Sequence, residues 1–516
     1  MAQGYYYERI TMQRKLTIYY TSDAHGYFSP VDYASGKSAQ SGLANCMNGF
    51  ANDGNTLIID GGDILQGSPL TYYLYSQRRD GDCVPARLLN LGGYDFVTLG
   101  NHDFNYGKAE IERYLRELDA VCLCANIGGI AGVRRIAVVT LQNGLRVGLT
   151  GVTMHFVTQW EQPANLDGIT VTDAFTAAAE AYAELQQQQV DLTVCIYHGG
   201  FECDLETGEP LTDSAENQAC RLCRELDFDL VLTGHQHMRV DGVRFCNSFA
   251  VQPTYRAPHC CGITVTVEDD GSKRFESRII PAEGKPLARA YDLLLPLEKR
   301  VQTWLDTPAG HLDLPLVSED HLKAALNGSY LANFINTVQL EASGAQIASS
   351  ALPNEFKGLP TEVTIRDVVS TYIYTNTLVV LEMTRPALKQ YIERSAAYFD
   401  HDEDGNLCIA DEFLRPKVQH YNYDFFSGIH YTIDARNPVG QRVTSIVLDG
   451  RELGEDEPVT VCVNSYRFCG TGGYDMLPKQ KVAREVLTDV ADAMIDYITS
   501  HPNIRVDTEK YCTVIG

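Results

Sequence analysis

The sequence predicts a layered α/β fold. Short apolar runs that suit buried strands alternate with longer amphipathic stretches that suit helices through the first half of the chain. Several of these runs end directly in Asp, Asn or His, as expected where parallel strands gather functional residues at their carboxyl ends. With 516 residues, 44% of them hydrophobic, the chain is long enough for roughly two to four domains with full-sized cores.

The expected elements follow one another with spacings typical of strands joined by crossover helices. We predict strands at residues 16–22, 56–59, 95–99, 146–150, 192–197 and 230–234, and helices at residues 108–118, 174–189 and 215–226.

Side chains with metal-ligand chemistry stand at five of these strand ends. Each one alone has an ordinary interpretation, such as a polar turn or a hydrogen-bonded core histidine. Their recurrence at five strand ends favours a shared metal site instead. The predicted ligands are Asp23, His25, Asp63, Asn101, His198, His235 and His237.

The donor set indicates two divalent metal ions. Carboxylate, amide and imidazole donors suit manganese, zinc, iron or cobalt. Seven donors also exceed the three that a mononuclear catalytic zinc site uses. Two ions about 3.5–4 Å apart clamp a phosphoryl group and generate a hydroxide that attacks phosphorus in line. We expect His102 to stabilise the phosphoryl oxygens or to protonate the leaving oxygen, with Asp103 orienting its ring.

The charge balance narrows the class of partner. The formal net charge of −25 argues against a nucleic-acid polymer, because binding one requires Lys and Arg to neutralise its phosphates. Small nucleotides remain possible, since bound metal ions reverse the local sign of the charge. No run approaches the roughly 20 apolar residues that cross a bilayer, so we expect no membrane partner. The oligomeric state stays open.

The first residues and the cysteines predict a cytoplasmic location. No basic segment followed by an apolar core is visible at the beginning of the sequence, as a signal peptide would require. Fifteen cysteines are an odd number and suggest reduced thiols. We interpret the spacing Cys220-Arg-Leu-Cys223, with Cys203 upstream, as incidental rather than as a zinc or redox motif.

The strand-end motifs resemble those of the calcineurin-like metallophosphoesterases over roughly residues 14–265. The matching blocks are Asp23-x-His25, Gly62-Asp63, Gly100-Asn-His-Asp103, His198 and Gly234-His-x-His237. The resemblance implies two sheets flanked by helices and a pair of metal ions. One ion would be held by Asp23, His25, Asp63 and His237, and the other by Asp63, Asn101, His198 and His235, so that Asp63 bridges them.

A second domain is expected after the first. We divide the chain into a catalytic domain at residues 1–286, a helical connector at 287–320 and a substrate-binding domain at 321–516. The last part resembles the C-terminal α/β domain of the 5′-nucleotidase superfamily, through blocks at residues 332–336, 363–368, 374–378, 421–429 and 464–474.

The resemblance implies that two aromatic rings of this domain sandwich a nucleotide base, and stacking of this kind contributes about 1–3 kcal/mol per base. By position, Tyr466 is one ring, and Tyr423 is favoured over Tyr421 for the other. Gly472 and Gly473 fit a loop that approaches the ligand closely. The competing interpretation is that these tyrosines are ordinary strand residues.

The details of the blocks favour one branch of the superfamily. Classical 5′-nucleotidases carry a phosphate-binding arginine before the block at residue 363, and the corresponding residues 349–358 contain none. The blocks look more like the 2′,3′-cyclic-nucleotide 2′-phosphodiesterase/3′-nucleotidase branch. The alternatives are a 5′-nucleotidase or nucleotide-sugar hydrolase with the same machinery and, more distantly, a non-catalytic nucleotide-binding protein.

Overall fold

The computed structural model describes residues 13–76, 81–210, 215–374, 376–415, 417–486, 488–501 and 503–516, apart from the side chains of residues 159 and 160. The chain forms two compact units. The first comprises Met1–Asp32, Lys37–Thr158 and Pro163–Glu298, and the second Tyr33–Gly36, Gln159–Gln162 and Lys299–Gly516. Both units combine sheets with helices, so the predicted α/β class is confirmed.

The first unit contains a seven-stranded sheet. Five of its strands are parallel neighbours, and two antiparallel strands extend it beyond β1. The strand order is β17 (Lys273–Pro281), β16 (His259–Val267), β1 (Arg14–Thr21), β4 (Thr56–Asp60), β5 (Phe96–Val97), β6 (Val121–Leu123) and β8 (Val133–Arg134).

A six-stranded sheet forms the second layer of this unit. Its four central strands are parallel, and each edge strand is antiparallel to its neighbour. The strand order is β14 (Val240–Phe245), β15 (Ser248–Gln252), β13 (Leu230–Thr233), β12 (Leu192–His198), β10 (Arg146–Thr153) and β9 (Ile136–Thr140).

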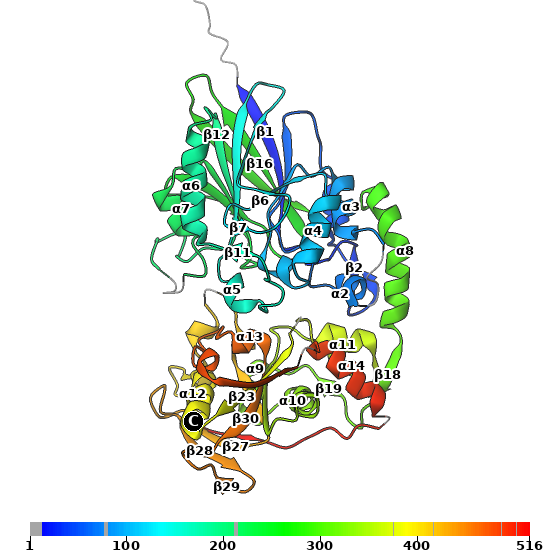
Figure 1. The fold of residues 1–516 in the computed structure, drawn as a ribbon, viewed down its shortest axis with the longest axis vertical. Coiled ribbons are helices and arrows are strands. Elements are labelled where there is room, and N and C mark those ends of the chain that lie inside the picture. The colour runs from blue at the N-terminus through cyan, green and yellow to red at the C-terminus, as the bar shows by residue number, and fades with distance from the viewer. Residues whose placement is uncertain are drawn as a thin grey trace, which may run out of the picture. The chain divides into compact units, whose positions relative to one another are not determined.

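The main hydrophobic core of the first unit joins the two sheets. Alternate residues of β1, such as Leu16 and Ile18, pack with Val194 and Ile196 of β12 in one buried cluster. Helices α6 and α7 pack against strands of the six-stranded sheet, and α3 and α4 lie on the opposite side of the unit (Figure 1). The predicted arrangement of two sheets flanked by helices is therefore confirmed.

The helices and short strands in this part of the chain are α1 (Leu43–Met47), α2 (Pro69–Ser76), α3 (Val84–Gly92), α4 (Lys108–Glu117), α5 (Val157–Trp160), α6 (Ala174–Gln186), α7 (Ala219–Glu225), β2 (Val31–Asp32), β3 (Lys37–Ser38), β7 (Ile127–Gly128) and β11 (Thr170–Val171).

Two predicted elements are shorter than the sequence suggested. The strand expected at residues 95–99 is only the two residues of β5, and Asn101–Phe104 form a 3₁₀ turn, η1. The helix expected from residue 215 begins at Ala219. The side chains of Asn217 and Gln218 bond to other segments of the unit, so these residues serve as anchors in front of the helix.

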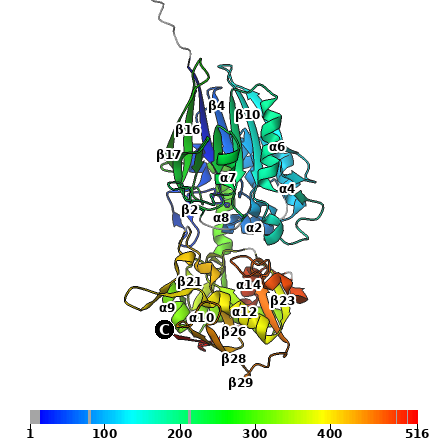
Figure 2. The same ribbon diagram turned by 90° about the vertical axis from the view of Figure 1, so that its left-hand side faces the viewer.

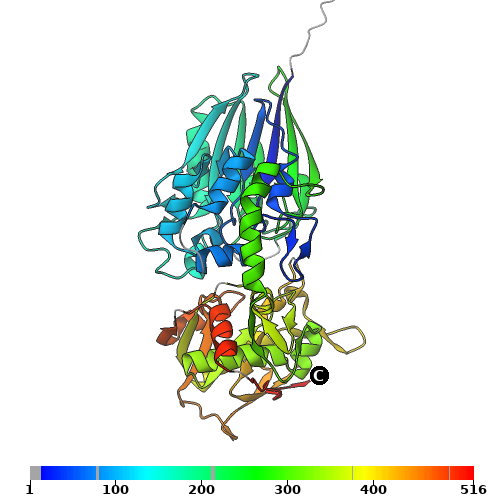
Figure 3. The ribbon, with the colours of Figure 1, turned by 90° about the vertical axis from the view of Figure 1, so that its right-hand side faces the viewer.

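The predicted connector is helical only in its first part. Helix α8 (Ala288–Leu305), the long green helix in Figure 3, contains Pro296 without ending there, and the boundary between the two units falls within it. The residues after it form β18 (Pro308–His311) and β19 (Leu316–Val317), which pair with β22 (Glu362–Thr364) and β21 (Gly358–Leu359). The connector at 287–320 is thus a helix followed by strands of the second unit.

The second unit contains a five-stranded sheet with helix α10 packed against it (Figure 2). Its strand order is β26 (Asp424–Ser427), β20 (Ile347–Ala351), β30 (Val459–Asn464), β23 (Leu378–Met383) and β31 (Lys481–Val486). A four-stranded sheet has the order β29 (Arg451–Glu452), β28 (Val443–Leu448), β27 (His430–Asp434) and β32 (Cys512–Ile515). The remaining elements are α9 (His321–Asn327), α10 (Tyr330–Ser343), α11 (Ile365–Thr371), α12 (Arg385–Ala396), β24 (Phe399–His401), β25 (Leu407–Ile409), η2 (Asp411–Phe413), η3 (His420–Asn422), α13 (Ser465–Phe468), η4 (Leu477–Lys479) and α14 (Val490–Ser500).

The cysteines differ from the prediction at one pair. Cys203 and Cys220 form a disulfide, whereas the other thirteen cysteines are free. The expectation that all the thiols are reduced is wrong for this pair. The cytoplasmic location stays a prediction. Within the described ranges, no helix combines the length and the apolar character needed to cross a membrane.

Candidate active site

The seven predicted metal ligands lie at the carboxyl ends of strands from both sheets of the first unit. The seven-stranded sheet supplies four of them after β1, β4 and β5, and the six-stranded sheet supplies three at β12 and β13. Five have positive φ angles: Asp23 (55°), His25 (47°), Asp63 (56°), His235 (70°) and His237 (57°). Residues other than glycine rarely adopt this conformation, and such strain is concentrated at functional sites.

The first cluster consists of Asp23, His25 and His237, whose ligand atoms lie within 4.8 Å of one another. The Nε2 atoms of the two histidines are 3.1 Å apart, and Nε2 of His237 lies 3.6 Å from Asp23 Oδ1. His25 donates its Nδ1–H to the carbonyl oxygen of Gln66 at 3.0 Å, which leaves the Nε2 lone pair for a ligand. Burial lowers the pKa of His25 to about 4, so its ring is neutral, as a metal ligand must be.

The second cluster consists of Asp23, Asp63 and His198 and continues into Asn101 and His235. His198 Nε2 lies 3.2 Å from Asp63 Oδ2 and 3.2 Å from Asn101 Oδ1. Its Nδ1–H is donated to the carbonyl oxygen of Gly61 at 2.7 Å. Asp63 Oδ2 is also 3.6 Å from His25 Nε2, so one carboxylate faces histidines of both clusters.

Buried negative charge makes this site suitable for cations. Asp23 and Asp63 are 0% and 1% exposed, and no Lys or Arg among the described residues forms an ion pair with either. Burial opposes ionisation of Asp63, but His198, His102 and His25 lower its pKa well below the usual value. Burial likewise opposes protonation of His198, but Asp63 raises the pKa of its ring to about 10. In the metal-free protein, protons on the histidines balance the negative charge of the carboxylates. Divalent ions bound here would supply this positive charge instead.

His102 lies beside the first cluster, with its ring centroid 5.2 Å from that of His25. Its Nδ1 bonds to Oδ1 of Asn105 at 2.9 Å. The predicted orienting residue, Asp103, has a different role. Its carboxylate accepts backbone N–H groups of Asp63, Ile64, Leu65 and Gly100 at 2.8–2.9 Å. Asp103 therefore ties two ligand loops together, and Asn105 orients the His102 ring.

Close packing of two glycines lets these loops approach each other. A side chain at Gly62, where φ is 93°, would meet the backbone of Gly100, and a side chain at Gly100 would meet the Asp63 carboxylate. Glycine at both positions thus allows the loops after β4 and β5 to bring Asp63 and Asn101 together.

In the second unit, the preference for Tyr423 as a base-stacking ring is contradicted by its burial. Tyr423 is 2% exposed, and its ring packs against Tyr398, Phe399 and Phe425. A base could reach it only if this core repacked. Tyr421 lies in the 3₁₀ turn η3 and is half-buried, as is Tyr466. Tyr421 and Tyr466 are therefore the better candidates.

A buried arginine connects the two blocks that carry these tyrosines. Arg467 donates to both carboxylate oxygens of Asp424 at 2.9 and 2.8 Å and to the carbonyl oxygen of Tyr421 at 2.7 Å. Its guanidinium also lies 4.0 Å from the ring centroid of Tyr474. The spacing between the two tyrosine blocks is thus set by an internal ion pair.

The predicted loop glycines are explained by contacts within the protein. Gly472 and Gly473 have φ angles of 77° and 83°. An added Cβ at Gly472 would meet the Asn422 side chain, and one at Gly473 would meet Arg394. Their conformation and packing require glycine without a ligand.

Further residues at the metal site carry no motif that the sequence could have revealed. The ring of Tyr255 stacks on His237 with centroids 4.4 Å apart. Arg256 has a positive φ of 65°, and its Cζ lies 4.9 Å from the ring centroid of Tyr255. Glu216 Oε1 lies 2.8 Å from His235 Nε2. The one feature of the sequence that could have pointed to Tyr255 and Arg256 is their position shortly after the apolar strand β15. Glu216 has no such feature.

Comparison with known proteins assigns the chain to a family. A model of the calcineurin-like phosphoesterases matches residues 16–239, and a model of the 5′-nucleotidase C-terminal domain matches residues 310–479. A Staphylococcus aureus structure named for 5′-nucleotidase is 31% identical, with a TM-score of 0.90 over 98% of this chain and 100% of that one. The chain belongs to the 5′-nucleotidase family. The predicted metal-dependent phosphoric ester hydrolase is thereby confirmed, and the family implies divalent metal ions.

Two curated relatives extend this result. A 2′,3′-cyclic-nucleotide 2′-phosphodiesterase/3′-nucleotidase from Salmonella typhimurium is 25% identical over 89% of this chain and 82% of its own length. The trifunctional nucleotide phosphoesterase protein YfkN from Bacillus subtilis is 22% identical over 96% of this chain, which spans only 39% of that relative. A 5′-nucleotidase precursor from Thermus thermophilus shares the fold, with a TM-score of 0.70 and 20% identity over 97% of this chain and 99% of that one.

Proposed function

We propose that this family member hydrolyses 2′,3′-cyclic nucleotides and 3′-nucleotides with two divalent metal ions, and so takes part in nucleotide breakdown. The observation that carries the two-ion proposal is the position of Asp63, whose carboxylate faces histidines of both clusters. The choice of substrate is supported by the names of relatives that match most of the chain and by the lack of arginine in residues 349–358.

The seven ligand residues would hold the ions in the two sets expected from the family. Asp23, His25, Asp63 and His237 would hold one, and Asp63, Asn101, His198 and His235 the other. When bound, two such ions polarise the phosphoryl oxygens and make water a nucleophile near neutral pH.

His102 would act on the substrate rather than on a metal ion. Because its Nδ1 bonds to Asn105, its Nε2 is the ring atom available to the phosphoryl group or the leaving oxygen. Because Nδ1–H is donated to Asn105, Nε2 carries a proton only when the ring is an imidazolium; in that form Nε2–H would bond to the departing oxygen, and transfer of this proton would complete cleavage.

Recognition of the base would fall to Tyr421 and Tyr466. Both rings are half-buried, and the Arg467–Asp424 pair fixes the loops that carry them. A ring held in this way loses little conformational freedom when a base stacks on it.

A 5′-nucleotidase is the second candidate, because the 31% identical Staphylococcus aureus protein carries that name. The two functions are separated by measuring kcat/KM for 2′,3′-cyclic AMP, 3′-AMP and 5′-AMP with manganese, before and after chelation. The proposal expects the cyclic and 3′ substrates to be preferred and all activity to be lost on chelation. Preference for 5′-AMP would select the second candidate, and activity that survives chelation would refute the metal mechanism.

A further inference from the structure

His235 offers both of its ring nitrogens to oxygen acceptors. Nδ1 lies 2.9 Å from the amide oxygen of Asn101, and Nε2 lies 2.8 Å from the carboxylate oxygen of Glu216. A histidine that binds a metal ion is a neutral imidazole with one N–H, so with an ion on one nitrogen only the contact of the other nitrogen can be a hydrogen bond. A carboxylate is the stronger acceptor for that proton. The Nδ1 atom and the Asn101 oxygen then face each other with lone pairs and no hydrogen between them. A cation bound to both atoms would make this close approach favourable.

We propose that Glu216 is a positioning residue that holds the proton of His235 on Nε2 and so presents Nδ1 to the metal ion shared with Asn101. This inference rests on the proposed two-metal function. An outer carboxylate that fixes the tautomer and the orientation of a histidine ligand changes metal affinity without touching the ion. The Glu216 side chain is 31% exposed, so it can be changed without opening a core.

The residues that follow Glu216 are anchored to the strand end that carries His198. Asn217 Oδ1 accepts the N–H of Gly200 at 2.7 Å, and the N–H of Ala219 is donated to the carbonyl oxygen of Gly200 at 3.0 Å. Gln218 also accepts the N–H of Phe175 at 3.0 Å. Glu216 is therefore placed by its neighbours and not by its own contact with His235 alone.

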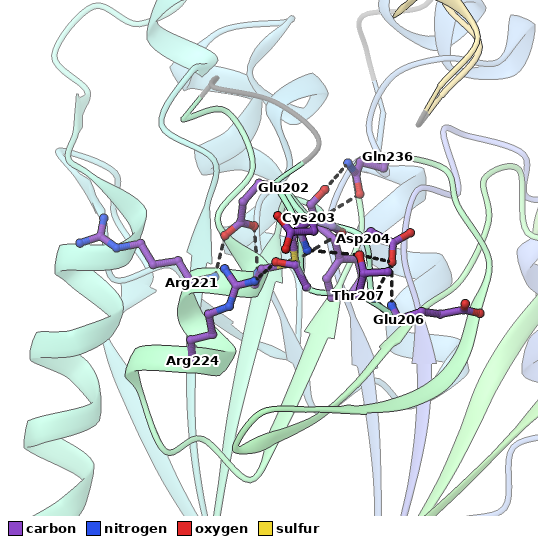
Figure 4. The surroundings of a disulfide bond; sticks show 12 residues. Glu202, Cys203, Asp204, Glu206, Thr207, Arg221, Arg224 and Gln236 are labelled. Carbon is purple, nitrogen blue, oxygen red and sulfur yellow. Dashed lines mark hydrogen bonds between the residues drawn. A yellow bond between two sulfur atoms is a disulfide. The ribbon is translucent and has the colours of Figure 1, made fainter. Parts of the chain in front are cut away.

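The disulfide between Cys203 and Cys220 links the residues just after Glu216 to the residues just after His198 (Figure 4). Next to it, the Glu202 carboxylate accepts the backbone N–H groups of Cys220 and Arg221 at the start of α7. On the other side, Gln236, which lies between His235 and His237, bonds through both side-chain atoms to the backbone of Phe201 at 2.7 and 2.9 Å. The disulfide thus joins the segment that holds Gln236 to the segment that holds Glu216.

Metal affinity in the full-length chain tests the proposal. The protein would be stripped by chelation and titrated with Co²⁺, and binding would be followed by calorimetry and by the visible absorption of the bound ion. Glu216→Ala should weaken one of the two ions by about 10–100-fold, the usual range for loss of an outer partner of a histidine ligand. Glu216→Gln should recover most of this loss, because its amide oxygen accepts the same N–H.

Glu202→Ala is the matched control. It removes a carboxylate that bonds to the same segment but contacts no metal ligand. It should lower Tm and weaken Co²⁺ binding far less than Glu216→Ala does, because Glu216 keeps its contact with His235. The Cys203→Ala/Cys220→Ala variant should weaken the same ion as Glu216→Ala by a smaller factor, because Glu216 keeps its neighbours but loses the covalent closure.

Each outcome has a defined meaning. Two ions bound by Glu216→Ala with wild-type affinities would overturn this inference and leave the proposed function intact. Equal weakening by Glu202→Ala would also overturn it, because the effect would then belong to the segment as a whole. A wild-type protein that binds fewer than two Co²⁺ ions would instead refute the two-metal function on which the inference rests.

Discussion

The metal-ligand residues of the first unit and the tyrosine blocks of the second unit are built differently. Asp23, His25 and Asp63 project their ligand atoms toward one another from strained backbone positions. In the second unit, two buried charged residues of the tyrosine blocks, Arg467 and Asp424, bind each other. In the first unit the motif residues are themselves the expected metal ligands. In the second unit the buried motif residues mainly hold in place the loops that carry two half-buried tyrosines.

The largest effect is expected from Asp63, the residue on which the two-metal proposal for the first unit depends most. Asp63→Asn should remove nearly all hydrolysis of every substrate, because one carboxylate serves both clusters. The variant should remain folded, as judged by circular dichroism. Asp60→Asn is the matched control: Asp60 ends β4, its carboxylate accepts hydrogen bonds from the Thr21 hydroxyl and the backbone N–H of Gly62, and this variant should keep its activity.

The next effect separates a catalyst from a ligand. His102→Asn should lower kcat by about 10²–10⁴-fold, the range for general acid–base assistance. Its metal content, measured by mass spectrometry, should equal that of the wild type. Loss of one metal equivalent would mean that His102 belongs to the ligand set.

Stability sharpens the description of the second unit. Arg467→Met should reduce the free energy of unfolding in urea by about 3–5 kcal/mol, because Asp424 would remain buried without its partner. Arg436→Met breaks an exposed pair with Asp434 and should leave the urea midpoint where it is. Equal behaviour of the two variants would show that Arg467 does not support the tyrosine blocks.

A smaller effect is expected from the residue that orients His102. Asn105→Ala should lower kcat by up to about 10²-fold, since a misplaced catalytic ring costs about that much. Asn105→Asp keeps an oxygen acceptor for Nδ1 and should retain most of the activity. If both variants are equally impaired, the contact between Asn105 and His102 does not orient the ring.

The smallest effect concerns the bases. Tyr421→Ala and Tyr466→Ala should each weaken kcat/KM for 2′,3′-cyclic AMP by about 1–3 kcal/mol. Hydrolysis of bis(p-nitrophenyl) phosphate, which has no base, should change far less. Tyr423→Phe is the matched control and should change neither. Equal losses on both substrates would return the two tyrosines to a purely structural role.

The difference between the units also explains what the sequence could predict. Asp23 and His198 directly follow predicted apolar strands and Asp63 follows one after a short glycine turn, so the strand pattern alone predicts that they converge. Asp103 and Asn105 both lie within three residues of His102, and only the geometry of the 3₁₀ turn decides which one meets the ring.

Other details depend on contacts between distant segments, which no local pattern specifies. Tyr421 and Tyr423 would share a face of a regular strand, but the turn η3 separates a half-buried ring from one in the core. Cys220, at the start of α7, pairs with Cys203, in the segment after β12, rather than with its sequence neighbour Cys223. Glu216 likewise meets His235 only through the fold.

The central claim is a pair of metal ions that share Asp63. Anomalous diffraction from crystals loaded with Mn²⁺ tests it most directly. We expect two peaks about 3.5–4 Å apart, both coordinated by the Asp63 carboxylate, with His25 and His237 on one side and His198 and His235 on the other. A single peak, or two peaks that do not share Asp63, would contradict the account.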